Sequence, residues 1–367
     1  MQRAVEFADS SPEPAVERLY DGVYADSHQD ADEDAETAAV ETKTCREALR
    51  EALVTELDRD ENVVLIGEDI GVYGGTQLVT DGLYDRYGAH RVIDTPISEN
   101  GFVGTAIGMA MTGLRPIVEM MTWNFSFLAV DQIIQNAAKV RYFSGGQVKV
   151  PLVIRGPNGG GVQLSAQHTH SLESFYGHFP GLKVVAPVTP NDVKGMMLTA
   201  VRDDNCVIFL EAGALYGTKG EVAEGDNAVP FGRARIAREG GDVTLVSYGR
   251  QVALCLAAAE RLAEDGIESE VIDLRSLRPL DEETVVASVR KTHRAVAVQE
   301  QWRWFGVASE VAAIIQDRAF DDLDAPVERV SGAEVPAPYA HNLEIAAFPS
   351  VDQVVAAGRR VLYREEG

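Results

Sequence analysis

The sequence is poor in cysteine and contains no long run of apolar residues. Its three cysteines, Cys45, Cys206 and Cys255, are widely separated and form no CxxC pair. We therefore expect neither a disulfide framework nor a zinc site, and a reducing cytoplasm fits this cysteine usage. Without an apolar run of about 20 residues, no membrane helix is expected. Residues 1–40 also lack the apolar segment of a secretory signal.

Basic residues are also scarce. Asp and Glu number 57 against 33 Lys and Arg, which gives a formal net charge of −24. Residues 1–41 carry −10 of this charge, so the remainder of the chain is acidic as well. Such a balance argues against nucleic acid and anionic membranes as partners. Only 7 of the basic residues are lysines. An acidic, lysine-poor surface suits a salt-rich cytoplasm, and an ordinary acidic enzyme explains it equally well.

Several common enzyme motifs are missing. The sequence has no GxGxxG after a strand, no GxxxxGK[ST], no HExxH and no spaced Cys/His set. Dinucleotide, P-loop and zinc sites are therefore not supported. Ser165 and Ser171 lie near histidines but outside a nucleophile-elbow context, so a hydrolase triad is not favoured either.

The apolar pattern predicts an α/β protein with two doubly wound domains. Residues 1–41 are acidic, without a sustained apolar period, and are expected to be disordered or loosely attached. Residues 42–215 alternate short apolar strands with helices, which is typical of a mostly parallel sheet. Residues 216–240 are glycine-rich and charged and are expected to form a linker. The alternation restarts over residues 241–367 and predicts a second, smaller domain.

The expected elements follow from this alternation. In the first domain we expect strands at 62–67, 116–121, 151–155, 182–186 and 206–211, and helices at 45–59, 125–143 and 191–202. In the second we expect strands at 243–247, 270–273, 295–299 and 327–330, and helices at 251–264, 281–291, 307–318 and 350–363.

The stretch DTPISENGFVGTAIG, residues 94–108, joins a short strand signal to a helix rich in small residues. Ser98 is expected to accept hydrogen bonds from the first free amides of that helix. Glu99 would then lie at a strand-to-helix junction, where α/β proteins place ligand chemistry. A capped helix with an acidic first turn, favoured by the helix dipole, also explains Glu99.

A glycine-rich loop carries most of the remaining chemistry. The stretch GPNGGGVQLSAQHTHS places His168 and His170 in a segment expected to be exposed. His168 is the best candidate for proton transfer near neutral pH, although a surface histidine without function fits the pattern as well. In MTWNFS, Phe125 is explained by core packing or by stacking on a planar cofactor.

Taken together, these stretches resemble a known family. IGEDIG, RVIDTPISENGFVG, GLRPIVEMMTWNFS, DQIIQNAAKVRYFSGG, VIRGPNGGG, AQHTHS and GHFPGLKVVAP are similar to the beta subunit of thiamin-diphosphate-dependent 2-oxo acid dehydrogenases. GDVTLVSYG, VIDLRSLRPLD and APYAHNLE resemble the C-terminal domain of that family. The resemblance runs from about residue 42 to the end. It implies a transketolase-like pyrimidine-binding domain followed by a transketolase C-terminal domain.

The resemblance also implies partners. In that family thiamin diphosphate lies between this chain and an alpha chain, whose GDG…N motif holds Mg²⁺ and the diphosphate. This sequence contains no GDG, so it is expected to provide half of an active site. The implied assembly has two alpha and two beta chains and passes its product to a lipoyl-bearing dihydrolipoyl acyltransferase. The glycine face of the helix after Glu99, formed by Gly101, Gly104 and Gly108, is expected to pack closely across a subunit interface.

The resemblance assigns roles to four side chains. Glu99 matches the glutamate that meets N1′ of the cofactor aminopyrimidine and shares its proton with that atom. Phe125 matches the aromatic residue that stacks on the pyrimidine, and Met121 matches a neighbour in the same pocket. His168 matches a histidine near the reacting carbon, with a role in acyl transfer to the lipoyl group. His170 stands where relatives usually have Gln, and its role is open.

Members of the family also bind a potassium-like ion in this chain, mostly through backbone carbonyls. The matching positions are Leu152, Ala200, Val201, Asp203 and Asn205.

The predicted function is oxidative decarboxylation of a 2-oxo acid with acyl transfer to a lipoyl group. MTWNFS and RGPNGGG are more similar to pyruvate-specific members, which would transfer an acetyl group, than to branched-chain members. Branched-chain 2-oxo acid and acetoin dehydrogenases remain alternatives of the same architecture. A non-catalytic scaffold subunit is an alternative of another class, and Glu99 argues against it because a scaffold needs no acid at the pyrimidine position.

Overall fold

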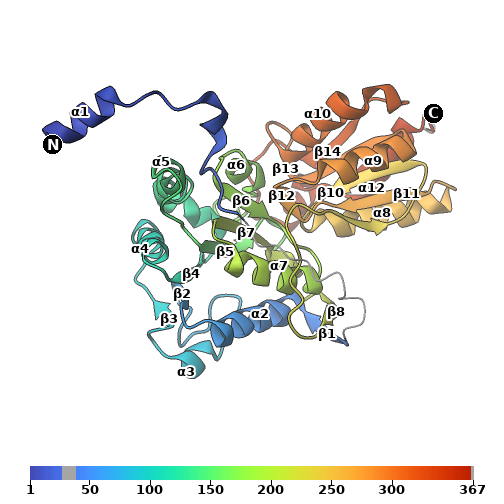
Figure 1. Cartoon of the computed structure of the whole chain (residues 1–367). Coiled ribbons are helices and arrows are strands. Elements are labelled where there is room, and N and C mark those ends of the chain that lie inside the picture. The colour runs from blue at the N-terminus through green and yellow to red at the C-terminus, as the bar shows by residue number, and fades with distance from the viewer. Residues whose placement is uncertain (27–38, 365–367) are drawn as a thin grey trace.

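The computed structural model describes residues 1–26 and 39–364, which form two α/β domains side by side with an N-terminal arm (Figure 1). The first domain has a seven-stranded sheet with the order β12-β6-β7-β5-β4-β2-β3. All strands but β12 are parallel. The strands are β2 (Val63–Gly67), β3 (Val92–Asp94), β4 (Arg115–Glu119), β5 (Leu152–Asn158), β6 (Leu182–Val185), β7 (Cys206–Ala212) and β12 (Ser276–Arg278).

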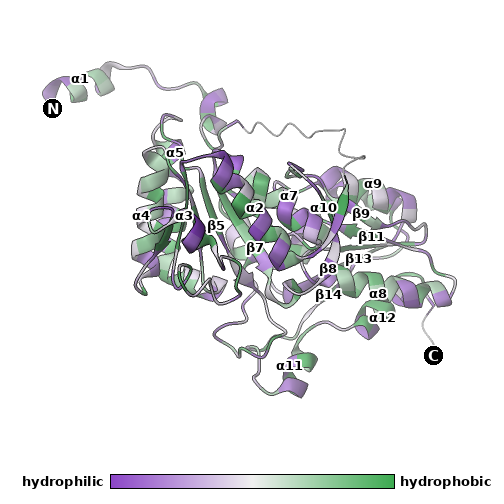
Figure 2. Cartoon of the chain, turned by 90° about the horizontal axis from the view of Figure 1, so that it is seen from below, coloured by the Kyte–Doolittle hydropathy of each residue, from purple (hydrophilic) through white to green (hydrophobic). Residues whose placement is uncertain are grey.

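Helices cover both faces of this sheet, so its central strands are buried runs of apolar residues rather than alternating ones. On β4, Ile117 packs into the core beneath α2 and α7, whereas Val118 packs into the core on the side of α4. Figure 2 shows these central strands mainly in hydrophobic green. The helices are α2 (Cys45–Arg59), α3 (Leu83–Tyr87), α4 (Glu99–Met111), α5 (Val140–Phe143), α6 (Glu173–Gly177) and α7 (Pro190–Arg202).

The prediction of one long regular helix over 125–143 is wrong. The chain instead forms the 3-10 helix η3 (Trp123–Ala129), the π-helical turn η4 (Gln132–Ala137) and the short α5. Buried polar contacts hold the first of these turns. The Trp123 indole donates to the Phe209 carbonyl at 3.3 Å, and the Ser126 hydroxyl donates to the Trp123 carbonyl at 2.6 Å. The bond of Trp123 to β7 is a tertiary contact that helical periodicity does not reveal.

The second domain is built on a five-stranded sheet with the order β14-β13-β10-β11-β9. Only β9 is antiparallel. The strands are β9 (Arg235–Arg238), β10 (Val243–Ser247), β11 (Ser269–Asp273), β13 (Ala295–Trp302) and β14 (Glu328–Gly332). The helices are α8 (Gln251–Glu264), α9 (Glu282–Thr292), α10 (Val307–Ala319), α11 (His341–Ala347) and α12 (Val351–Val361), and η6 (Phe320–Asp322) is a 3-10 turn. The 3-10 turn η5 (Gly213–Leu215) follows β7 at the end of the first domain.

The segment expected to be a linker, 216–240, contains regular structure. Within it, β8 (Lys219–Ala223) pairs antiparallel with β1 (Val40–Thr44), and β9 joins the second sheet. Both strands are short and lie at edges, and most of their side chains are not buried. They therefore carry little of the apolar signal from which strands are predicted.

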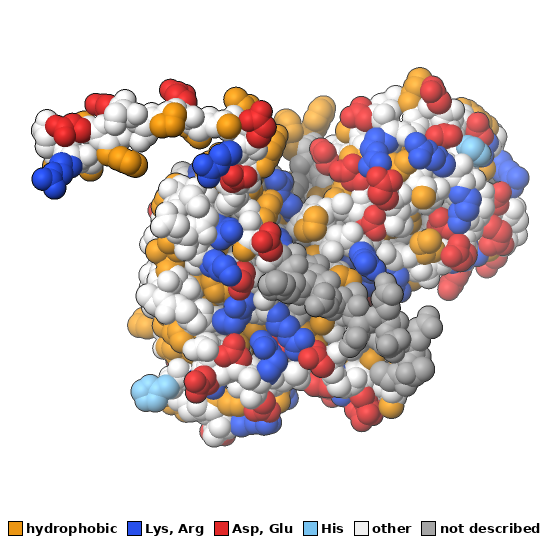
Figure 3. Space-filling model, in the orientation of Figure 1, with side chains coloured by type: hydrophobic (Ala, Val, Ile, Leu, Met, Phe, Trp, Pro, Cys, Tyr) orange, Lys and Arg blue, Asp and Glu red, His pale blue; other side chains and the backbone are white. Residues whose placement is uncertain are grey.

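The acidic extension also departs from expectation. It forms α1 (Gln2–Ser10) and the 3-10 turn η1 (Val16–Tyr20), neither of which buries a residue, and Figure 3 shows this arm projecting from the surface. Its end is attached: the Ala25 amide donates to Asn205 Oδ1 at 2.6 Å, and Asn205 Nδ2 donates to the Ala25 carbonyl at 3.1 Å. The extension, expected to be disordered or loosely attached, is therefore attached to the first domain at Ala25, whereas α1 and η1 bury no residue. Its remaining part, 27–38, lies outside the described residues.

Within residues 1–26 and 39–364, no helix has the length and apolar content needed to cross a bilayer.

Candidate active site

The carboxyl ends of β2, β3 and β4 meet at one edge of the first sheet, because neighbouring parallel strands end on the same side. Glu68 follows β2 directly, and Met121 follows two residues after β4. Glu99 is the first residue of α4, and its exposed fraction is only 5%. An acid therefore lies buried at the strand-to-helix junction.

A second carboxyl group lies beside Glu99. Glu68 Oε1 accepts a hydrogen bond from the Ser98 amide at 3.3 Å, next to Glu99 in the chain. Burial raises the pKa of Glu68, and the charge of Glu99 raises it further. The junction is thus a pair of acids rather than a lone one. Glu68, in the stretch IGEDIG, was not predicted as a site residue, although its place at the end of a strand is a usable signal.

The predicted cap of α4 is absent in the described part of the chain. The Ser98 hydroxyl donates to the Pro96 carbonyl at 3.0 Å and accepts no amide of the helix. The helix begins instead with the Phe102 amide donating to the Ser98 carbonyl at 2.9 Å. A capping motif therefore does not account for Glu99.

The predicted aromatic residue and the predicted histidine lie next to each other. The rings of Phe125 and His168 meet edge to face with their centroids 5.2 Å apart. Phe125 is half-buried on η3, which packs against α4, the helix that begins with Glu99. Met121 is also half-buried. Phe125 and His168 therefore lie next to each other on segments that follow β4 and β5, and Phe125 belongs to a turn that packs against the helix of Glu99.

His170 has a different environment from His168. Its Nδ1 contacts the Asn124 side-chain amide, and its ring packs edge to face on Phe127 at 5.8 Å and on Trp302 at 5.9 Å. Burial lowers the pKa of His170. His170 therefore packs between η3 and the second domain.

The five positions matched to a cation site lie at the opposite edge of the same sheet. Leu152 opens β5 and lies opposite Cys206, the first residue of β7. The carbonyls of Val201 and Asp203 each accept a hydrogen bond from Arg115 at 2.6 Å. The other two positions, Ala200 and Asn205, flank them.

The atoms that could bind a cation at this edge are chiefly oxygen atoms at the end of a helix. Asp203 is buried, and its carboxylate accepts from Lys183 Nζ at 2.5 Å and from the Asn205 amide at 2.8 Å. Nowhere in the described residues do three or more His, Cys, Asp or Glu side chains gather as a metal site would require. A hard cation here would depend on carbonyl oxygens, each of which has a second lone pair.

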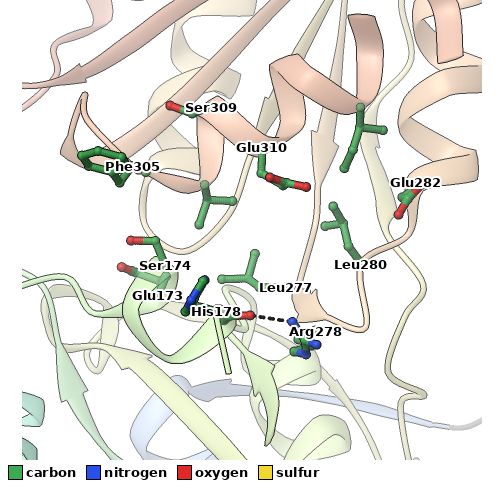
Figure 4. A pocket seen from close by; sticks show the side chains of 14 residues that line it. Glu173, Ser174, His178, Leu277, Arg278, Leu280, Glu282, Phe305, Ser309 and Glu310 are labelled. Atoms are coloured by element: carbon green, nitrogen blue, oxygen red, sulfur yellow. Dashed lines mark hydrogen bonds between the residues drawn. The ribbon is translucent and has the colours of Figure 1, made fainter. Parts of the chain in front are cut away.

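A cavity of about 610 Å³ lies apart from this site, between α6 of the first domain and the start of α10 of the second (Figure 4). Arg278 lines this cavity and donates a hydrogen bond to the Gly177 carbonyl at 2.8 Å. Glu99, Met121, Phe125 and His168 are not among the residues that line it. The cavity therefore belongs to the domain junction.

The first domain matches the transketolase pyrimidine-binding domain over residues 41–218, and the second matches the transketolase C-terminal domain over residues 232–354. The chain is 52% identical over 320 residues to the pyruvate dehydrogenase E1 component subunit beta of Rickettsia conorii, covering 87% of this chain and 98% of that relative. The chain belongs to the pyruvate dehydrogenase E1 beta-subunit family.

Other members of the E1 beta family lie nearly as close. The mitochondrial E1 subunit beta-2 of Oryza sativa is 48% identical over 332 residues, covering 89% of this chain and 88% of that relative. A solved structure described as a split-gene transketolase, an inactive beta4 tetramer, superposes with a TM-score of 0.72 at 24% identity, covering 88% of this chain and 99% of that one. The predicted family and the predicted two-domain α/β fold are both confirmed.

The residues present fit one half of thiamin diphosphate. A buried carboxyl group, Glu99, suits a ring nitrogen, and the half-buried Phe125 ring suits stacking of a flat heterocycle. The sequence has no GDG motif for the diphosphate and its metal. The E1 beta chain therefore fits the pyrimidine end of the cofactor.

Proposed function

We propose that this chain is the catalytic beta subunit of a pyruvate dehydrogenase. With an alpha subunit it decarboxylates pyruvate and passes the acetyl group to the lipoyl arm of a dihydrolipoyl acyltransferase. One observation carries the proposal: in a chain of the E1 beta family, a buried acid, Glu99, opens α4, and α4 packs against η3, whose Phe125 contacts His168.

Each side chain has a distinct task in this proposal. Thiamin diphosphate, when bound, would supply a nucleophilic carbon for the keto group and an electron sink for decarboxylation. Glu99 holds and moves a proton at N1′ of the pyrimidine, and Phe125 and Met121 fix the plane of that ring. Glu68, whose pKa is raised by burial and by Glu99, retains a proton closer to neutral pH than an ordinary glutamate does.

His168 acts later in the reaction. It lies at the edge of Phe125 on a loop whose tip, 161–164, is exposed, so an incoming lipoyl arm can reach it. An imidazole is suited to donating a proton to the dithiolane sulfur because its ordinary pKa lies near cellular pH. Its position separates this task from that of Glu99.

Substrate turnover tests the proposal. Purified alpha–beta protein is assayed with pyruvate, 2-oxoisovalerate and acetoin, and pyruvate is expected to have the highest kcat/KM. Preference for one of the other two would assign the chain to the branched-chain or acetoin enzyme. Absence of turnover with all three, in protein that binds thiamin diphosphate and Mg²⁺, would favour a scaffold subunit.

We also infer the setting and assembly of the chain. Its three cysteines are free and buried, which suits a reducing cytoplasm. The alpha subunit would hold Mg²⁺, and two chains of each kind would complete the active sites.

A potassium ion at the carbonyl edge is a further part of the proposal. The carbonyls at the end of α7 lie at the negative end of the helix dipole, which favours a cation. Unfolding is followed in KCl and in NaCl at equal ionic strength. Potassium at ten times its dissociation constant would stabilise the folded chain by about 1.4 kcal/mol. Equal melting temperatures in the two salts would remove potassium from the proposal.

A further inference from the structure

The glycine run at 159–161 lies directly against the second domain. A Cβ atom at Gly159 would come within 2.6 Å of Glu300 Oε1, and one at Gly161 within 2.5 Å of an Arg250 guanidinium nitrogen. A Cβ at Gly160 would collide with the Phe348 ring. Glu300, Arg250 and Phe348 all belong to the second domain. A side chain at any of the three positions would have to displace atoms of the second domain, and Gly159 and Gly161 also have φ values of +82° and +90°, which favour glycine.

Glu300 fastens both ends of the loop that carries His168. Its Oε1 accepts hydrogen bonds from the Gly160 amide at 2.7 Å and from the Ser171 hydroxyl at 2.9 Å. Gly160 lies just before the exposed tip and Ser171 lies three residues after His168. A single carboxylate oxygen thus joins the entry and the exit of the loop.

The next two residues of β13 contact the same loop. Gln301 Nε2 donates to the Ser171 carbonyl at 3.2 Å and to Glu173 at 2.5 Å. Trp302 packs on the ring of His170. The end of one strand in the second domain therefore meets the base of the loop at three successive positions.

Glu300 is itself firmly held. Its exposed fraction is 7%, and its second oxygen accepts from Arg250 Nε and, at 3.2 Å, from Gln251 Nε2. The Arg250 guanidinium lies 4.6 Å over the Phe348 ring. Arg250 compensates the buried charge of Glu300, and the pair forms a rigid anchor.

We propose that Glu300 is a positioning residue for acyl transfer: by joining Gly160 to Ser171 it sets the loop so that His168 lies against Phe125. The second domain then tunes a step of catalysis through a side chain that touches no substrate. This inference rests on the proposed role of His168.

Glu300→Ala in the assembled alpha–beta enzyme tests the proposal. Misplacing His168 by about 1 Å is expected to slow acetylation of a lipoyl domain by roughly 10- to 100-fold. Decarboxylation measured with an artificial electron acceptor should change by no more than about twofold, because Glu99 lies on another element. Equal losses in the two assays would overturn the proposal.

The double variant Glu300→Ala/His168→Ala separates positioning from general damage. If Glu300 acts through His168, the double variant transfers acetyl groups no more slowly than His168→Ala alone. Losses that multiply would show that Glu300 acts independently and would overturn the proposal. Ser171→Ala removes only the hydrogen bond from the Ser171 hydroxyl to Glu300, so it should slow acetyl transfer less than Glu300→Ala does. This variant replaces Glu300→Ala in the test if Glu300→Ala folds poorly.

Hydrogen exchange tests the anchoring without reference to activity. Amides 161–170 should exchange faster in Glu300→Ala than in the wild type, and unchanged exchange would overturn the proposal. Glu56→Gln is the matched control, since Glu56 is a buried carboxylate bonded to Arg59 and Arg202 far from the loop. If His168→Ala leaves acetyl transfer intact while the loop still loosens in Glu300→Ala, the proposed role of His168 fails and the anchoring stands.

Discussion

At the scale of the residue, Glu99 is the group on which decarboxylation should depend most. Glu99→Gln keeps the size of the side chain but removes its transferable proton. Thiamin diphosphate binding to the alpha–beta protein should survive, while turnover should fall by about 100-fold or more. Calorimetry of cofactor binding and turnover on pyruvate measure the two effects. Near-normal turnover would contradict the role given to Glu99.

His168 should affect the second half of the reaction instead. In His168→Ala, acetyl transfer to a lipoyl domain should slow by about 10²-fold, more than decarboxylation with an artificial acceptor. His170→Ala is the neighbouring control, because His170 contacts Asn124 and Trp302 rather than Phe125. Equal losses in both assays would indicate substrate binding, and no loss would leave His168 a surface histidine.

Glu173 should make the fold sensitive to pH. Burial raises its pKa to about 7, and the charge of Glu300 adds to the effect. A carboxyl group with a raised folded-state pKa stabilises the fold below its unfolded pKa, about 4.5, and this contribution is lost as pH rises through about 7. The loss is up to roughly 3 kcal/mol.

Melting temperatures of Glu173→Gln at pH values of about 5 and about 8 measure this effect. The variant should differ less between the two conditions than the wild type does, because it carries no titrating group there. Glu224→Gln, on an exposed side chain, should leave the wild-type pH dependence unchanged. If the melting temperature of Glu173→Gln depends on pH as strongly as that of the wild type, groups other than Glu173 cause the dependence.

Single residues could be proposed as site residues from the sequence only where they lie in a recognisable local motif. Glu99, Phe125 and His168 sit in local motifs, so resemblance pointed to them. Glu300 and Ser171 are 129 positions apart, and their hydrogen bond exists only once two domains have packed. No local pattern records such a pair.

At the scale of the element, the strands on which the core depends could be predicted because they are buried runs of apolar residues. The edge strands β8, β9 and β12 were missed, since short polar strands depend on the partner they pair with. The helix expected over 125–143 failed for a related reason. Buried bonds of Trp123 and Ser126 hold the first turn, η3, and periodicity does not show them.

Three neighbouring strands share one buried cluster of charges, which was not predicted from the sequence. Arg155 on β5 bonds Glu119 on β4 and Glu211 on β7, and all three are nearly inaccessible to solvent. Arg155→Met would leave two carboxylates buried without a cation. We expect a loss of about 3–5 kcal/mol in the free energy of unfolding.

Urea unfolding of Arg155→Met measures this loss. Arg86→Met is the control, because the Arg86–Asp58 pair is about half exposed and should contribute no more than about 1 kcal/mol. The loss in the free energy of unfolding caused by Arg155→Met should be smaller at low pH. Burial already raises the pKa of Glu119, so this carboxyl group can then be neutral. A loss as small as that of the control would mean that the cluster is solvated.

At the scale of the whole molecule, the outer face of α4 should be an assembly surface. Gly101 and Gly108 are exposed, and a Cβ at Gly108 would meet nothing within 4 Å in the described chain. Gly108→Leu should therefore leave the fold of the beta chain intact, or stabilise α4 by up to about 1 kcal/mol. It should prevent assembly with the alpha subunit or with a second beta chain.

Size-exclusion chromatography with light scattering measures the assembly, and circular dichroism the fold. Ala253→Leu, at an exposed position of α8 in the second domain, is the matched control and should assemble normally. Normal assembly of Gly108→Leu would place the interface elsewhere. Tight binding of thiamin diphosphate by a lone monomeric beta chain would contradict the half-site.

The antiparallel strand β12 has a consequence for how this protein can be divided. It follows β11 of the second domain in the chain, yet it pairs with β6 and closes the edge of the first sheet. A fragment ending near residue 218 would lack it and leave the backbone donors and acceptors of β6 open to pairing with other chains. The two domains recognised in the sequence are therefore not interchangeable. A chimera with a different C-terminal half must supply a strand that pairs with β6 as β12 does. Otherwise β6 remains an unpaired edge strand that can pair with other chains.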